Sequence, residues 1–415
     1  MGWDYEDGEL SLRYALDHLR FEERFIFPDA GRLDLGTGFE QALSVLHVCA
    51  GTSYYKAAAP GFVSGLPMGA EVFASDLFQH GLAEFAMTND LDPIRPVFMS
   101  GPARLPGTVP LAGDGPALVA VGGGKDSIVT IESAKRVDRA VMLASVGTHP
   151  AIERTAAVSG LEHLVIQRRI DPLLLQLNAQ GARNGHVPVT AINSAALATL
   201  AAGLGAEAVV MSNESSASVP ITTHRGLPVN HQWSKSLAAE RSLAALLPVP
   251  YFSLLRPLHE VEICRRFAPL SGYFGDVTSC NQAYTAAGRE AGLRWCGQCP
   301  KCRFVFLAMA PFLGPDALVA MFEGRDLLAD DCAANIAGYR AILGLGGDPP
   351  MECVGTTRES KWALTRLAEH PDWRRRTVVR ALSAEVDVVA GWDPLAERGP
   401  HAIPPAWQDV VDALA

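Results

Sequence analysis

The chain has 415 residues, enough for two or three domains with sizeable cores. With 48% hydrophobic and 19% charged residues, its composition is that of a globular enzyme and excludes a largely disordered protein. The net charge of −10 argues against a general nucleic-acid surface, because such surfaces need clustered lysine and arginine. The acidic start has no pattern of a secretion signal, and no window reaches the ~18 apolar residues of a membrane span, so we expect a cytoplasmic protein without a membrane partner.

Residues 1–108 are predicted to form a small α+β N-terminal domain. Apolar residues recur at helical spacing over residues 9–23 and 69–89, whereas residues 24–27 are typical of a strand that ends at Pro28. Residues 105–116 contain three prolines and three glycines, which suits a connection between domains.

Residues 109–315 are predicted to form an α/β domain with a doubly wound parallel sheet. Short apolar runs alternate there with helical patterns, at residues 117–121, 140–146, 161–167, 206–211 and 250–255. Such runs indicate strands covered on both faces, and ligands of this architecture bind beyond the carboxyl ends of the strands. Residues 316–415 are predicted to be mostly helical, with segments at 317–328, 333–343, 361–369 and 376–388.

A glycine-rich run directly follows the first of these strands and precedes a helix: Gly122, Gly123, Gly124, Lys125, Asp126 and Ser127. Glycines let the backbone approach an anion, free N–H groups and the positive helix end favour phosphate, and Lys125 adds a mobile charge. The alternative is a turn with a solvated lysine. The run resembles the PP-loop of ATP pyrophosphatases, usually Ser-Gly-Gly-x-Asp-Ser, with Gly122 in place of the serine. This resemblance implies a Rossmann-like fold and cleavage of ATP to AMP and pyrophosphate after adenylation of an acceptor oxygen.

Two polar segments are expected near the same sheet edge. Asn213 and Glu214 follow a buried strand, where Glu214 could hold Mg²⁺ over the ATP phosphates or orient the acceptor; the alternative is a serine-rich loop. His231 and Lys235 are four residues apart at the start of a predicted helix, so they would present an acid/base group and a cation on one face. A structural histidine is the competing interpretation.

Four of the eight cysteines form a C-x15-C-x2-C-x2-C cluster, at Cys280, Cys296, Cys299 and Cys302. Clustered thiolates in a cytosolic chain point to metal, and a closed four-sulfur site favours a structural zinc ion. An iron–sulfur cluster, a redox pair or no metal at all are the alternatives. The spacing also resembles the zinc knuckle of the PP-loop enzymes that make 7-cyano-7-deazaguanine.

A narrower resemblance spans most of the chain. It rests on residues 53–56, 122–127, 213–217, 230–236, 295–302 and 352–355, which together resemble the MurL family, the UDP-N-acetylmuramoyl-L-alanyl-L-glutamate epimerases of peptidoglycan synthesis. The resemblance implies that ATP and Mg²⁺ convert the terminal glutamate α-carboxylate into an acyl adenylate, which removes the charge that opposes α-proton removal. Reprotonation on the opposite face and hydrolysis would then give the D-glutamyl product, AMP and pyrophosphate.

Under this resemblance, His231 and Lys235 are the first candidates for the acid and base. Cys353 and Cys49 are the second pair, because thiols act as paired bases in cofactor-independent amino-acid racemases, although Cys49 in a helical pattern equally suits a small buried residue. Tyr55 and Lys56 are candidates for binding the anionic small-molecule substrate.

Two other functions fit parts of the sequence. A PP-loop enzyme could amidate a carboxylate or form a nitrile, as in 7-cyano-7-deazaguanine synthesis, or thiolate a transfer-RNA base, against which the acidic balance speaks. A nucleotide-binding regulator without catalysis is the third possibility. AMP formation and its dependence on a nitrogen source separate these functions.

Overall fold

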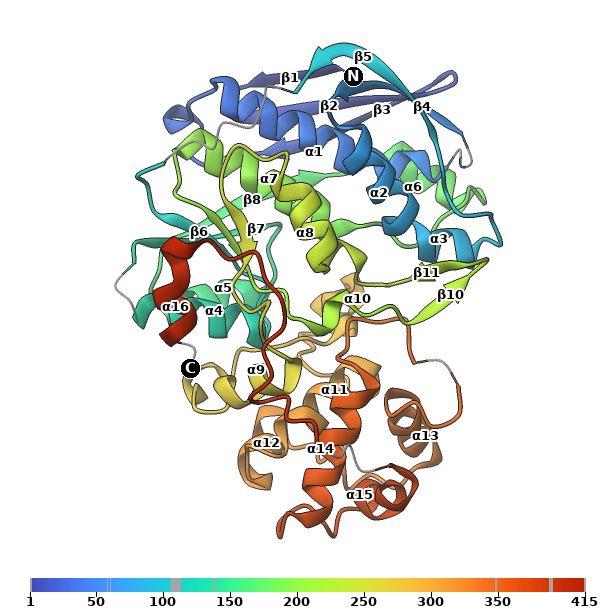
Figure 1. Ribbon diagram of the computed structural model, residues 1–415, viewed down its shortest axis with the longest axis vertical. Coiled ribbons are helices and arrows are strands. Elements are labelled where there is room, and N and C mark those ends of the chain that lie inside the picture. The colour runs from blue at the N-terminus through green and yellow to red at the C-terminus, as the bar shows by residue number, and fades with distance from the viewer. Residues whose placement is uncertain are drawn as a thin grey trace.

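The computed structural model describes residues 2–57, 59, 61–105, 113–136, 139–347, 349–387 and 391–413. Its centre is an eight-stranded mixed sheet of order β1-β2-β3-β8-β7-β6-β9-β12 (Figure 1). The strands are β1 (Gly2–Glu6), β2 (Glu9–Leu16), β3 (Leu19–Ile26), β6 (Ala117–Ala120), β7 (Val141–Val146), β8 (His163–Arg169), β9 (Val209–Met211) and β12 (Tyr251–Ser253).

The five predicted apolar runs form the parallel part of this sheet, from β8 to β12, which confirms the α/β expectation. Neighbouring residues of β6 point to opposite faces: Leu118 joins the core beside α1 (Thr37–Tyr55) and α7 (Val189–Leu204), whereas Val119 joins the core beside α4 (Lys125–Arg136) and α9 (Glu260–Phe267). Both faces of the parallel part of the sheet are therefore covered, which explains the apolar runs in these strands. Shorter helices complete the layers: α5 (Pro150–Ser159), α6 (Pro172–Ala179), α8 (Leu237–Ala244) and α10 (Ala286–Glu290).

The helix predicted over residues 9–23 is wrong, because this segment forms the hairpin of β2 and β3. Leu10 and Leu12 are fully buried two residues apart, and Asp17 adopts a left-handed turn conformation (φ 51°) between the strands. β3 also pairs antiparallel with β8. Hydrogen bonding of one sheet thus crosses the boundary predicted near residue 108.

The rest of the N-terminal segment packs against this sheet. The helical pattern predicted over residues 69–89 is confirmed as α2 (Glu71–Gly81) and α3 (Ala83–Thr88). Two small two-stranded sheets accompany it, parallel β4 (Phe62–Met68) with β5 (Val97–Arg104), and antiparallel β10 (Thr222–His224) with β11 (Leu227–Val229). Most of the predicted connection, residues 106–112, lies outside the described residues.

The C-terminal region is helical as predicted, with α11 (Pro300–Met309), α12 (Pro315–Met321), α13 (Ala333–Ile342), α14 (Thr357–Glu369) and α15 (Thr377–Leu382). α11 is central, since it contacts α9, α13 and α14. The chain then returns to the sheet, and α16 (Gln408–Ala413) lies beside α4 (Figure 1). Within the described residues, every helix is too short or too polar to span a bilayer.

Candidate active site

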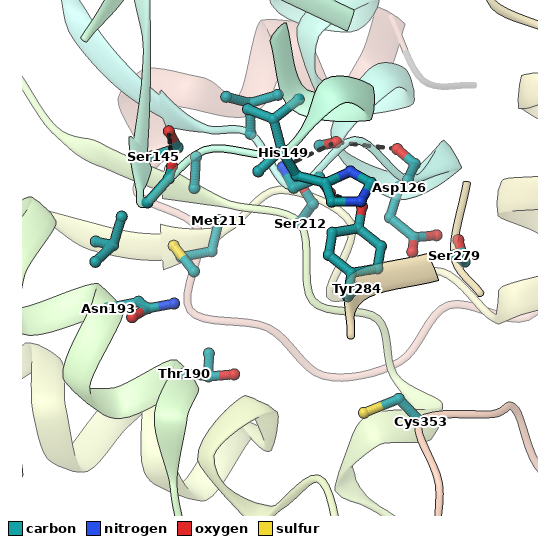
Figure 2. Close-up of a pocket in the computed structure, with 18 of the residues that line it drawn as sticks. Asp126, Ser145, His149, Thr190, Asn193, Met211, Ser212, Ser279, Tyr284 and Cys353 are labelled. Carbon is teal, nitrogen blue, oxygen red and sulfur yellow. Dashed lines mark hydrogen bonds between the residues drawn. The ribbon is translucent and has the colours of Figure 1, made fainter. Parts of the chain in front are cut away.

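A cavity of about 580 Å³ opens at the carboxyl ends of the parallel strands. The chain passes from β6 to β7 on one side and reaches β9 on the other, and the crevice at such a reversal of strand order is where ligands bind in open α/β sheets. The lining comes from distant segments, including Gly122, Asp126, Ser145, His149, Thr190, Asn193, Ser212, Tyr284 and Cys353 (Figure 2).

The glycine-rich loop forms one wall of this cavity. Gly123 has φ 76°, and a Cβ there would approach the Cβ of Ala151 to 2.9 Å, so only glycine fits. A Cβ on Gly122 would meet no described atom within 4 Å, because this position faces open space. The Tyr284 hydroxyl donates to the Gly122 carbonyl (2.7 Å) and fixes the loop at the N-terminus of α4. The loop is held by this hydrogen bond, faces open space at Gly122 and lies at the positive end of a helix, as an anion site requires.

Lys125 is not the mobile charge that the sequence suggested. Its ammonium is buried and contacts Glu260 and the Asp126 carboxylate, the latter at 2.5 Å. Burial opposes the charge, but the two carboxylates outweigh it and raise the pKa of Lys125. Lysine and arginine side chains that do line the cavity are Lys235, Lys301 and Arg289.

Cys353 lies on the opposite side of the cavity from Ser145 and His149, with its sulfur directed into the space (Figure 2). The Lys235 ammonium donates to the Cys353 Sγ at 3.4 Å, and His231 makes a further side-chain hydrogen bond to it. Burial alone would raise the pKa of this thiol; Lys235 and His231 more than reverse that effect and lower the pKa to about 6. Cys353 is therefore a thiolate at neutral pH.

His231 and Lys235 reach Cys353 without the helix predicted for them. The Asn230 side chain accepts from the Gln232 N–H, which makes a turn, and Lys235 ends a short 3-10 turn. α8 begins only at Leu237, because the Ser236 hydroxyl caps it. The prediction that His231 and Lys235 share a helix face was therefore wrong, but the turn still brings both side chains close to the sulfur of Cys353.

Behind His231 stands a pair of residues that the sequence analysis missed. Glu84, on α3, has its Oε2 2.6 Å from His231 Nδ1 and 3.7 Å from His186 Nδ1. Burial lowers the pKa of His231, but its bonds to Cys353 and Glu84 prevail and raise the pKa to about 9. Burial lowers the pKa of His186 to about 4, so this ring is neutral. Glu84, His186 and His231 lie close enough to bind a metal ion together. However, the 2.6 Å between His231 Nδ1 and Glu84 Oε2 is a hydrogen-bond length, so we interpret this contact as a hydrogen bond.

Of the two polar residues predicted to follow β9 at the site, Asn213 lies at the cavity and Glu214 lies in the interior. Asn213 lines the cavity and donates to the Ser253 hydroxyl at 2.9 Å. Glu214 is buried and is not among the lining residues; burial, followed by the negative charges of Glu260 and Asp126, raises its pKa to about 7. Asp126 is thus the acidic residue on the cavity wall.

The structure does not bring Cys49, Tyr55 or Lys56 to this cavity. Cys49 lies in α1, fully buried in the apolar core, and burial raises the pKa of its thiol, so its predicted pairing with Cys353 is not formed. The Lys56 ammonium donates to the Gly185 carbonyl at 2.7 Å, and burial lowers its pKa to about 8. Tyr55 lines a second cavity of about 760 Å³ near the β2–β3 hairpin.

The four clustered cysteines converge as their spacing predicts. Their Sγ atoms all lie within 4.8 Å of one another, with Cys302 3.8 Å from Cys296 and 3.5 Å from Cys299. Four convergent sulfurs fit a tetrahedral metal ion such as Zn²⁺. Lys301 lies between two of these cysteines, so the same knuckle carries a cation to the cavity wall, 3.7 Å from Glu260 Oε1.

Comparison with known proteins covers nearly the whole chain. Family models described as the MurL N-terminal domain and the MurL C-terminal domain match residues 1–254 and 276–395. A protein of Micromonospora sp. named UDP-N-acetyl-alpha-D-muramoyl-L-alanyl-L-glutamate epimerase is 45% identical over 97% of this chain and 94% of its own length. Proteins with the same name from Salinispora tropica and Xanthomonas oryzae pv. oryzae are 43% and 40% identical, over 99% and 98% of this chain and 94% of their own lengths.

Proposed function

The chain belongs to the MurL family, and we propose that it converts the terminal L-glutamate of UDP-N-acetylmuramoyl-L-alanyl-L-glutamate to D-glutamate at the expense of ATP, in peptidoglycan precursor synthesis. One observation carries the proposal beyond the family: a single cavity holds both an anion-binding glycine loop and a thiolate with two cations beside it. Phosphate chemistry and proton chemistry can therefore act on the same bound substrate.

Activation of the carboxylate explains why an epimerase would need ATP. Removing the α-proton next to a carboxylate adds charge to a group that is already anionic. Attack of a carboxylate oxygen on the α-phosphorus of ATP, with loss of pyrophosphate, gives a neutral acyl group whose carbonyl accepts the electrons of the broken C–H bond. The backbone N–H groups of residues 122–124 and the end of α4 would bind the phosphates. Asp126 would hold Mg²⁺, which supplies charge neutralisation to the phosphates.

The lining offers separate groups for binding and for proton transfer. Lys301 and Arg289 are placed to bind anionic groups of the substrate. Cys353, Lys235 and His231 form the titratable cluster that would take the α-proton from the substrate and return a proton to the opposite face. The cysteine knuckle, filled with Zn²⁺, would act structurally by fixing the position of Lys301.

The test is turnover in deuterium oxide with ATP, Mg²⁺ and the UDP-linked dipeptide. We expect D-glutamate carrying deuterium at the α-carbon, formed together with AMP and pyrophosphate. AMP formation only after addition of ammonia would instead indicate an amidating enzyme, and ATP binding without AMP would indicate a regulator. Cys332→Ala, a change of an exposed cysteine that is not among the residues lining the cavity, is the matched control and should keep full activity.

A further inference from the structure

Building on the proposed epimerase function, we propose that Cys353 is a nucleophile: it takes the activated glutamyl group as a thioester, and the α-proton is exchanged while the substrate is bound to sulfur. Cys353 and the glycine loop line the same cavity, and the sulfur is directed into its space (Figure 2), so an acyl adenylate formed at the loop would present its carbonyl to the thiolate.

The surroundings of Cys353 have the arrangement that nucleophilic cysteines need. His231 interacts with the sulfur and lowers the pKa of the thiol, and Glu84 Oε2 holds the Nδ1 of that imidazole at 2.6 Å. Cys353, His231 and Glu84 thus take the positions of a nucleophile, its imidazole partner and a group that orients the imidazole. Lys235 at 3.4 Å adds a second cation, so the thiolate persists without substrate.

The strength of the thiolate favours attack on carbon over removal of a proton. A thiol whose pKa is lowered to about 6 is a weaker base than an ordinary thiol. Nucleophilic attack is fastest when the pKa of the thiol is close to the ambient pH. The neighbouring cations therefore make Cys353 a weaker base toward the α-proton, but they also keep it ionised as the nucleophilic thiolate.

The transfer balances without another reactant. The thiolate attacks the glutamyl carbonyl carbon, an S–C bond forms, the bond from that carbon to the AMP oxygen breaks, and AMP leaves with the electron pair. Sulfur donates electrons to a carbonyl weakly, so the α-proton of the thioester is more acidic than that of a carboxylate. After inversion, water adds to the carbonyl and the C–S bond breaks, which gives the glutamate carboxylate, restores the thiolate and passes two protons to solvent.

Acylation also changes the neighbouring cations. The charge of Cys353 raises the pKa of both Lys235 and His231, although burial opposes it. Once the sulfur is acylated this charge is gone, and both pKa values fall. Lys235 lines the cavity next to the thioester. Once its ammonium has released its own proton to solvent, the neutral amine is placed to accept the α-proton.

The experiment is a single turnover with the whole enzyme in excess over substrate labelled in its glutamate, quenched in acid at successive times. We expect label bound to precipitated protein to rise and fall within one turnover, to be released by hydroxylamine, and to map to the peptide containing Cys353. AMP should equal the sum of bound label and free product. Conversion to D-glutamate with AMP but without protein-bound label at any time would overturn the thioester while leaving the epimerase function intact. Absence of D-glutamate would instead refute the epimerase function.

Two variants sharpen the result. Cys353→Ala should carry no label and form D-glutamate at least 100-fold more slowly, yet keep ATP–pyrophosphate exchange in the presence of substrate, because adenylation precedes transfer. Epimerisation by this variant at the wild-type rate would overturn the proposal. Glu84→Gln tests positioning: it should slow alkylation of Cys353 and move its pH midpoint upward, an effect that a merely structural role of Glu84 would not produce.

Discussion

At the scale of single residues, the site depends on how charge is shared around one sulfur. The groups that face Cys353 are the cations Lys235, His231 and Lys301 and the nearby carboxyl of Glu352. Burial would make a thiol neutral here, so the cations decide its state. Substituting one of these cations should therefore change the protonation of the Cys353 thiol while the cysteine itself is kept.

Lys235→Gln should therefore raise the pKa of Cys353 from about 6. Since alkylation requires thiolate, the pH midpoint of Cys353 modification by iodoacetamide should move upward, and the rate at pH 7 should fall by about tenfold for each unit that the pKa rises above 7. Peptide mass spectrometry over pH 5 to about 9 measures it. The exposed Cys332 in the same samples is the control and should react equally in both proteins. An unchanged midpoint would show that Lys235 does not hold the thiolate.

The sequence alone indicated Cys353, His231 and Lys235 but not the residues that support them. Glu84 and His186 come from segments that are distant in the chain, and each looks like an ordinary surface residue of a helix or loop. Lys301 was not predicted as a site residue because it lies within the cysteine motif, which indicated only a metal site. A local pattern reports backbone conformation and spacing, whereas tertiary packing brings these residues together; the contact of α3 with β11, for example, places Glu84 near His231.

At the scale of elements, the glycine loop is specified by two different constraints. Gly123 is required by a left-handed backbone and by contact with α5, whereas Gly122 is required only by the space that a ligand would occupy. Gly123→Ala should destabilise the fold by about 1–3 kcal/mol. Gly122→Ala should leave the free energy of unfolding nearly unchanged but weaken ATP binding. Urea unfolding and calorimetric titration of the two variants separate these effects, and equal losses of stability would contradict the assignment.

The cysteine knuckle is an element whose order should depend on a metal. Cys296→Ser removes one of four convergent ligands, so bound zinc, measured by plasma mass spectrometry, should fall from about one per chain. The melting temperature and ATP–pyrophosphate exchange should fall with it, because Lys301 would lose its anchor. Cys332→Ser should change neither quantity. A brown protein with visible absorption and iron would show that the site holds an iron–sulfur cluster.

Elements were predictable where one signal dominated. Each of the five parallel strands carries a short apolar run, and the C-terminal helices have apolar residues at a helical period, so both kinds of element could be predicted. The prediction for the β2–β3 hairpin was wrong because the apolar positions of its two eight-residue strands, taken together, also fit a helical spacing. Pairing of β3 with β8, 145 positions away between Glu23 and Arg168, left no local trace.

At the scale of the whole molecule, the N-terminal strands and the parallel strands that carry the cavity form one sheet, so they should unfold together. Glu23 on β3 is fully buried and forms an ion pair with Arg168 on β8 at 2.5 Å. Breaking a buried pair from one side leaves an unpaired charge, so Arg168→Leu should cost about 3–5 kcal/mol. A single unfolding transition, shifted as a whole, is expected by both fluorescence and circular dichroism.

The pH dependence of this variant has a definite sign. Burial raises the pKa of Glu23 above its unfolded value, and Arg168 partly offsets that rise. Without Arg168 the folded-state pKa rises further, so the folded variant favours the protonated carboxyl, and its stability is lost as pH increases through the range above 4.5. The deficit relative to wild type should therefore be larger at pH 8 than at pH 5. Glu23→Gln combined with Arg168→Leu removes the buried charge and should recover much of the loss with little pH dependence. Two separate transitions, or a deficit that grows toward low pH, would show that β3 and β8 do not couple the two parts of the sheet.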